Sequence, residues 1–260
     1  MLLAMTQLAT RCTRARFHVP ADAVVDGVTA LHLHGVEVGH PLPVRMTTAT
    51  TAQTRRPGVR LTRARTLPRH RNGLAAPVAA WRAAALDLDL VELVAAGDVL
   101  VHLGLCTLPE LVLVAGTATG RGCRLLRRAA SLVRERVDSI QETRVRLCLV
   151  LAGLPEPRCN VVLGHEGRVI GRVDLLVEEF GLVIEYDGDQ HRDRDQWNND
   201  LDRDDAFTDA DFSTIRVNRD RMRRPRQLVR KVHARLVERG YRGPAPTFSP
   251  EWIALFERRV

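Results

Sequence analysis

Three carboxylates lie in two short apolar segments that have the composition of buried β-strands. Asp174 occurs in GRVDLLV (171–177), and Glu185 and Asp187 occur in LVIEYDG (182–188). Burying a charged carboxylate costs free energy unless something compensates its charge, so acids on two neighbouring strands indicate a shared cation. Residues two apart point to the same side of a strand, and ligands that are all oxygen suit Mg²⁺ or Mn²⁺. The pattern predicts a divalent-metal site with Asp174 and Glu185 as ligands.

Such a metal site favours hydrolysis of a phosphodiester, because a metal that bridges phosphate and water activates both. His191 follows the second strand and titrates near neutral pH, so it could orient or deprotonate the attacking water. Asp187 has the same candidate role. Other interpretations stay open: the strand acids could form ion pairs with Arg172 or Arg216, and Asp187 and His191 could be turn residues.

The elements that would position these residues form a regular series. We expect a helix over 139–152, strands over 159–163, 168–177 and 182–186, and a polar helix over 195–209. A strand over 212–217 and a final helix from Pro225 to Gly240 complete it. This order predicts a three-layer α/β domain with a mixed sheet. Ser139 and Glu142 have the spacing of a capping box at the start of the first helix, which by itself explains the glutamate.

Residues 139–222 resemble the very-short-patch-repair-like endonucleases of the PD-(D/E)XK superfamily. The matching segments are SIQETR (139–144), AGLP (152–155), GRVDL (171–175), IEYDGDQH (184–191), Trp197, Asp200, Arg203, Asp204 and IRV (215–217). The resemblance implies a restriction-endonuclease-like fold, with Asp174 and Glu185 as metal ligands. It implies supporting catalytic roles for Glu142, Asp187 and His191. Asp187 stands where the superfamily motif has lysine, so the identity of the general base stays open.

The preceding region is expected to be a smaller mixed α/β domain. A helix within 22–36 that ends at Gly35, β-prone stretches at 42–47 and 59–64, and helices at 75–86 and 88–96 are predicted, with Gly97 as a helix stop. Segments 24–35 and 87–94 resemble type IV antitoxins of the abortive-infection kind, which usually begin with a winged helix-turn-helix. The predicted division is an antitoxin-like domain over 1–120, a basic linking helix over 121–137, an endonuclease-like domain over 138–241 and a tail over 242–260.

The charge balance favours an anionic partner. The chain of 260 residues has 39 Lys and Arg against 31 Asp and Glu, for a net charge of +8, which is typical of nucleic-acid-binding proteins. A genome that encodes arginine freely would give the same balance, since Lys231 is the only lysine. Candidates for phosphate binding are Arg216, Arg219 and Arg221, just after the proposed site. A second arginine cluster is formed by Arg55, Arg56, Arg60, Arg63, Arg65, Arg69 and Arg71.

From the sequence we expect a cytoplasmic, Mg²⁺- or Mn²⁺-dependent endonuclease that hydrolyses DNA, in repair or in defence against foreign DNA. The five cysteines form no CxxC pair, which argues against a zinc site, and no segment predicts a membrane span. The alternative is a catalytically inactive nucleic-acid-binding regulator or antitoxin-like protein. A toxin as protein partner and a homodimer remain further hypotheses.

Overall fold

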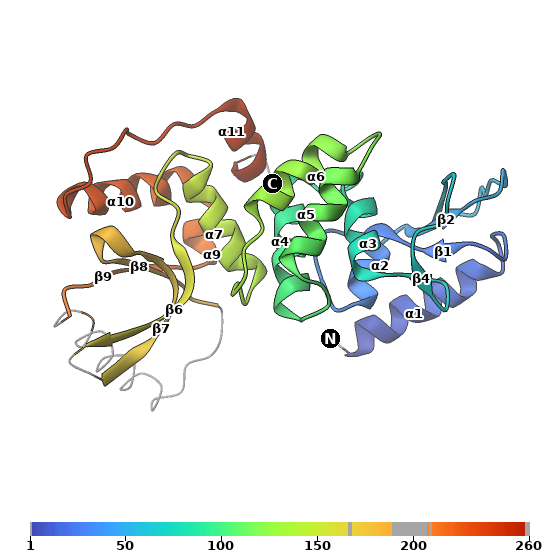
Figure 1. Cartoon of the computed structure of the whole chain (residues 1–260), viewed down its shortest axis with the longest axis horizontal. Helices are drawn as coiled ribbons and strands as arrows, with labels where there is room; N and C mark the ends of the chain where they lie inside the picture. Colours follow the sequence, from blue (N-terminus) through green and yellow to red (C-terminus); the bar gives the residue numbers. More distant parts are fainter. Residues whose placement is uncertain (1, 166–167, 189–206, 208–209, 258–260) are drawn as a thin grey trace. The chain divides into compact units, whose positions relative to one another are not determined.

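The computed structural model describes residues 2–165, 168–188, 207 and 210–257. The chain is an α/β protein that divides into two compact units, Met1–Glu135 and Arg136–Val260, each with its own mixed sheet (Figure 1). The first unit is not the smaller of the two, since these bounds give it 135 residues against 125. None of the helices in the described ranges is long and apolar enough to cross a membrane.

The sheet of the first unit has the strand order β3-β2-β1-β5-β4. Its strands are β1 (Val24–Val25), β2 (Val44–Thr48), β3 (Val59–Arg63), β4 (His70–Arg71) and β5 (Leu74–Ala75). β2 pairs with β3 in parallel and with β1 in antiparallel orientation. The stretches predicted as β-prone are therefore confirmed as β2 and β3, and the helix predicted within 22–36 is confirmed as α2 (Gly27–Leu33), which ends just before Gly35.

Helices make up most of the first unit's core. They are α1 (Leu2–Arg16), α2 (Gly27–Leu33), α3 (Pro77–Ala84), α4 (Leu90–His102), α5 (Leu108–Thr117) and α6 (Cys123–Leu132). Asp89 and Glu92 form a capping box at the start of α4, and Thr107 and Glu110 form another at α5. α6, within the predicted linking segment, packs against α4 and α5.

The sequence suggested that Gly97 ends a helix, but this prediction is wrong, since Gly97 lies in the middle of α4. A Cβ atom at this position would lie 2.6 Å from Cγ2 of Val133 and 3.3 Å from Nε1 of Trp81. The glycine is therefore explained by close packing. Trp81 is fully buried and its Nε1 donates to the carbonyl of Leu93 over 2.8 Å, which ties α3 to α4.

The sheet of the second unit has the order β6-β7-β8-β9. Its strands are β6 (Arg158–His165), β7 (Arg168–Val177), β8 (Leu182–Tyr186) and β9 (Ser213–Val217). β6, β7 and β8 are successive antiparallel neighbours, and β8 pairs with β9 in parallel. All four predicted strands are thus present. The polar helix predicted over 195–209 lies largely outside the described residues.

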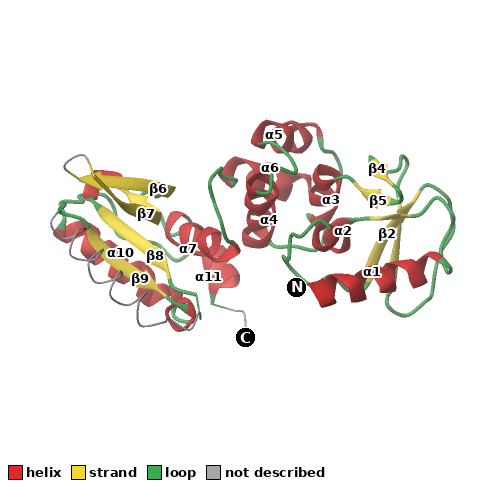
Figure 2. Cartoon of the chain, turned by 90° about the horizontal axis from the view of Figure 1, so that it is seen from below, coloured by secondary structure: helices red, strands yellow, loops and turns green. Residues whose placement is uncertain are grey.

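Four helices complete the described part of this unit: α7 (Ile140–Val150), α9 (Arg219–Met222), α10 (Pro225–Glu238) and α11 (Pro250–Phe256). α7 packs on β7, β8 and α10, and Figure 2 shows α10 running alongside the sheet. The predicted tail holds α11, whose buried Trp252 donates from Nε1 to the carbonyl of Cys148 over 2.9 Å. Arg226 on α10 fixes the end of α11 through a two-point ion pair with Glu257.

Candidate active site in the second unit

Asp174 lies next to the last residue of β7 that pairs with β8 through the backbone. The paired positions run from Val177 and Leu182 to Leu175 and Ile184. Just beyond them, Oδ2 of Asp174 accepts a hydrogen bond of 2.8 Å from the backbone nitrogen of Tyr186. The carboxylate therefore bonds directly to the backbone of the strand that carries Glu185.

The strand registers place an amide and two acids in one row across the sheet. Cys159 and Val161 on β6 pair with Leu175 and Val173 on β7, so Asn160 lies opposite Asp174. Continuing the β7–β8 register by one residue places Glu185 opposite Asp174 on the other side. Opposite residues of antiparallel strands lie on the same face of a sheet. Asn160, Asp174 and Glu185 thus occupy a single cross-strand row.

Glu142 reaches this row from α7. The helix begins at Ser139, whose hydroxyl accepts from the backbone nitrogen of Glu142 over 3.1 Å. The glutamate does not complete the capping box that the sequence suggested: its Oε2 accepts from the backbone nitrogen of Asp138 over 3.1 Å. The same oxygen accepts from Nδ2 of Asn160 over 2.7 Å. Glu142 is thus a buried carboxylate, 6% exposed, that links α7 to β6.

The surroundings of Glu142 hold its pKa above the usual value for a glutamate. Burial is the main cause, and the negative charge of Asp174 raises the pKa further. Hydrogen bonds from Ser139, Asp138 and Asn160 act in the opposite direction. Two carboxylates therefore interact unfavourably inside the unit, and a nearby cation would relieve this repulsion.

Asn160 is the residue of this cluster that the sequence analysis missed. Both hydrogens of its amide are used, one toward Glu142 and one toward the carbonyl of Arg136 over 2.8 Å. Its Oδ1 is buried and has no hydrogen-bond partner in the described part of the chain. Its φ of 46° suits asparagine, which tolerates this region better than most residues. The only signal in the sequence was one amide within a short apolar strand.

The remaining predicted residues are distributed as follows. Arg172, one proposed partner of Asp174, lies with Nη2 2.5 Å from Oδ2 of Asp138. The backbone nitrogen of Asp187 donates to the carbonyl of Val217 over 2.7 Å, which extends the pairing of β8 with β9. His191 and Trp197 lie outside the described residues. Among those that are described, no three His, Cys, Asp or Glu side chains form a group that could hold a metal ion.

Two of the predicted basic residues follow β9, and the third, Arg216, lies within it. β9 runs parallel to β8, and Glu185 pairs in register with Arg216. Asn218 caps the short helix α9 by accepting from the backbone nitrogen of Arg221 over 3.0 Å. Arg219 and Arg221 are exposed, and Nη1 of Arg221 donates to the carbonyl of Arg216. Of the arginines that could bind phosphate, Arg216 thus lies in the strand beside Glu185, and Arg219 and Arg221 come directly after that strand.

Comparisons of the chain with protein-family models, with curated proteins and with solved structures find no match.

Proposed function

We propose that the second unit is a Mg²⁺- or Mn²⁺-dependent nuclease of the PD-(D/E)XK type. It would hydrolyse DNA with Asp174 and Glu185 as the ligands of the metal ion. The observation that carries the proposal is the buried hydrogen bond between Glu142 and Asn160, at the position of β6 opposite Asp174. A folded protein buries a carboxylate beside a second acid only at a free-energy cost, and perturbed carboxylates of this kind are concentrated at functional sites.

The residues present fit a divalent cation of the magnesium type. Both candidate ligands are carboxylates, from Asp174 and Glu185, and the buried Oδ1 of Asn160, which has no partner among the described residues, is a further oxygen on the neighbouring strand. Mg²⁺ is usually held by one or two carboxylates, with water and substrate phosphate filling the other positions. Two protein carboxylates therefore suffice, and a third acid within the described ranges is not required.

Each side chain has a distinct part in the proposed reaction. When bound, the metal ion would polarise the scissile phosphate and make water a better nucleophile. Asp174 and Glu185 would hold it, and the hydrogen bond between Glu142 and Asn160 would fix α7 to β6, the strand beside Asp174. Arg216, Arg219 and Arg221 would bind phosphates that flank the scissile bond. Asp187 and His191 are the candidates for positioning the attacking water.

Plasmid cleavage tests the proposal. The full chain should convert supercoiled plasmid to the nicked form with Mg²⁺ or Mn²⁺, and chelation by EDTA should abolish the reaction. Asp174→Asn and Glu185→Gln should reduce cleavage to background, because each keeps the shape of the side chain and removes its charge. Asp174→Asn also leaves an oxygen that can accept from Tyr186.

A matched control separates the site from general effects of charge. Glu179, exposed next to β7, has the same acid-to-amide substitution available as Glu179→Gln, and this variant should cleave like the wild type. Cleavage that survives in both site variants would refute the mechanism. DNA binding without cleavage under either metal would favour the alternative, an inactive nucleic-acid-binding regulator.

A further inference from the structure

The first unit contains an open groove of about 920 Å³ that the nuclease proposal does not use. Its walls come from β2 and β3, the segment 64–69, α3, α5 and the start of α6. Six arginines line it against two acids, Asp26 and Glu110. The groove is therefore strongly cationic and lies entirely within one compact unit.

Five of the six arginines have side chains available for a ligand. Their side chains are exposed and form no hydrogen bond or close ion pair with the described residues, although Arg69 and Arg82 lie near enough to Glu110 and Asp26 to lower the pKa of those acids: Arg63, Arg65, Arg69, Arg82 and Arg121. Only three of the seven arginines that cluster between positions 55 and 71 of the sequence belong to this set. Arg60 instead pairs with Asp87 over 3.0 Å. The fold thus places only some of the clustered arginines in the groove.

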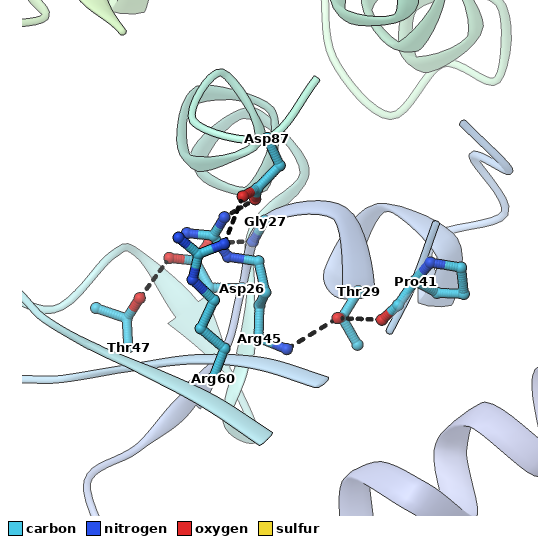
Figure 3. A network of polar contacts seen from close by, with 8 residues as sticks. All are labelled: Asp26, Gly27, Thr29, Pro41, Arg45, Thr47, Arg60 and Asp87. Carbon is cyan, nitrogen blue, oxygen red and sulfur yellow. Dashed lines mark hydrogen bonds and ion pairs between the residues drawn. The ribbon is translucent and has the colours of Figure 1, made fainter. Parts of the chain in front are cut away.

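Asp26 and Arg45, two charged residues that line the groove, take part in a network of internal polar contacts, as Figure 3 shows. The buried Asp26 accepts from the backbone nitrogen of Gly27 and from the hydroxyl of Thr47, each over 2.8 Å. Arg45, the sixth arginine, forms an ion pair with Asp87. Asp26 and Arg45 therefore have partners within the protein, and the five exposed arginines, which we call the arginine rim, give the groove a net positive charge for a ligand.

Part of the lining, which we call the apolar wall, consists of aliphatic side chains. Leu113 and Val114 on α5, with Leu86 and Leu105 nearby, face the same groove. Leu113 is 65% exposed and Leu86 42%, which is high for leucine in a folded unit. A ligand that fits both the arginines and the apolar wall must combine several negative charges with flat or apolar groups.

From this combination we infer that the groove binds an unpaired strand of nucleic acid, with its phosphates on the arginine rim and its bases against the apolar wall. Double-stranded DNA offers mainly phosphates to such a surface, because its bases are stacked inside and only their edges are reached from the grooves. An unpaired strand exposes its base faces, which pack on apolar and guanidinium surfaces. The inference does not depend on metal chemistry and goes beyond the proposed cleavage reaction.

Fluorescence anisotropy of the full chain with a labelled oligo(dT), in EDTA to prevent cleavage, tests the inference. The variant Arg63→Ala/Arg65→Ala/Arg69→Ala should bind about tenfold or more weakly than the wild type. Each lost contact to a single strand should reduce the slope of log affinity against log salt by about 0.7, so the three substitutions should reduce it by about 2.

The same arginine cluster supplies a matched control. Arg55→Ala/Arg56→Ala/Arg71→Ala removes the same charge from exposed positions that do not line the groove, and it should retain most of the affinity. For the apolar wall, Leu113→Glu should weaken binding, whereas Val112→Glu on the same helix should not, since Val112 is 51% exposed but lies outside the groove.

Four results would overturn the inference: no binding of oligo(dT), equal losses in the two triple variants, equal effects at positions 112 and 113, or tighter binding of duplex than of single strand. Displacement of oligo(dT) by an equal concentration of dTMP would instead identify a site for a free nucleotide and would also overturn it. Because EDTA keeps the nuclease site silent, failure here leaves the cleavage proposal unaffected.

Discussion

Nδ2 of Asn160 on β6 lies 2.7 Å from Oε2 of Glu142 on α7, and both residues are buried. This hydrogen bond joins the helix to the sheet at the strand position opposite Asp174. It also offsets part of the cost of burying Glu142, because a hydrogen bond to the charged form of a carboxyl lowers its pKa. Asn160 is therefore a positioning residue whose effect can be read directly from the titration of Glu142.

We expect substitutions of Asn160 to raise the pKa of Glu142 further. Asn160→Gly removes the donor without straining the backbone, since glycine accepts a positive φ. Asn160→Asp replaces the donor with a second negative charge and should have the larger effect. The carboxyl carbon signal of Glu142, followed by NMR as the pH is varied, measures the change. Asn72→Gly, at another asparagine with positive φ (51°) in the first unit, is the control. An unchanged titration in both Asn160 variants would contradict the role.

A second prediction concerns stability and pH. The pKa of Glu142 is raised above its ordinary value of 4.5, mainly by burial. The folded chain therefore holds this proton more tightly than the unfolded chain, and its stability falls as the pH rises between the two pKa values. Glu142→Gln cannot ionise and keeps an oxygen that accepts from Asn160. Its free energy of unfolding should exceed that of the wild type at neutral pH, and the difference should vanish below about pH 4.5.

Urea titrations at a series of pH values, followed by tryptophan fluorescence, measure this difference. Glu110 supplies a control of opposite sign, because hydrogen bonds from Thr107 lower its pKa. Glu110→Gln should therefore lose stability at neutral pH, with the loss disappearing at low pH. If Glu142→Gln behaved like Glu110→Gln, the burial of a repelled carboxylate at α7 would be disproved.

The sequence was sufficient for features that depend on local rules. Strands β7 and β8 follow from apolar segments of the right length, and the start of α7 follows from Ser139, which caps the helix as expected. The acids in these strands could be recognised because charges are rare in apolar segments. The side chain of Glu142 could not be placed, because its bond to Asn160 joins residues 18 positions apart in the chain.

For features that depend on long-range packing, the predictions from the sequence were wrong or could not be made. Gly97 has the local character of a helix stop, yet contact with Val133 on another segment explains it. Trp252 gave no sign that it would bond to the carbonyl of Cys148, which is 104 positions away. The arginines at positions 55–71 form one cluster in the sequence but separate into ion-paired, groove-lining and other exposed residues, because strand direction and turns decide where each side chain lies.

A third prediction follows from the proposed cation. A ligand that binds only the folded state stabilises it, by about 2.7 kcal/mol when its concentration is one hundred times its dissociation constant. Mg²⁺ or Mn²⁺ should therefore raise the melting temperature of the second unit. Asp174→Asn and Glu185→Gln should abolish the increase, and Glu179→Gln should retain it. An equal increase in all three variants would show that the metal acts elsewhere.

The last prediction compares two helical glycines of the first unit. Alanine is normally favoured over glycine inside a helix by about 1 kcal/mol. At Gly97 the added Cβ would lie 2.6 Å from Val133, so Gly97→Ala should instead destabilise the unit by about 1–3 kcal/mol, the usual cost of overpacking. Gly116 in α5 has nothing within 4 Å of such a Cβ, so Gly116→Ala should be neutral or slightly stabilising. Urea unfolding followed by tryptophan fluorescence, to which the buried Trp81 of this unit contributes, measures both. Equal stability of the two variants would contradict the close packing of Gly97 against Val133.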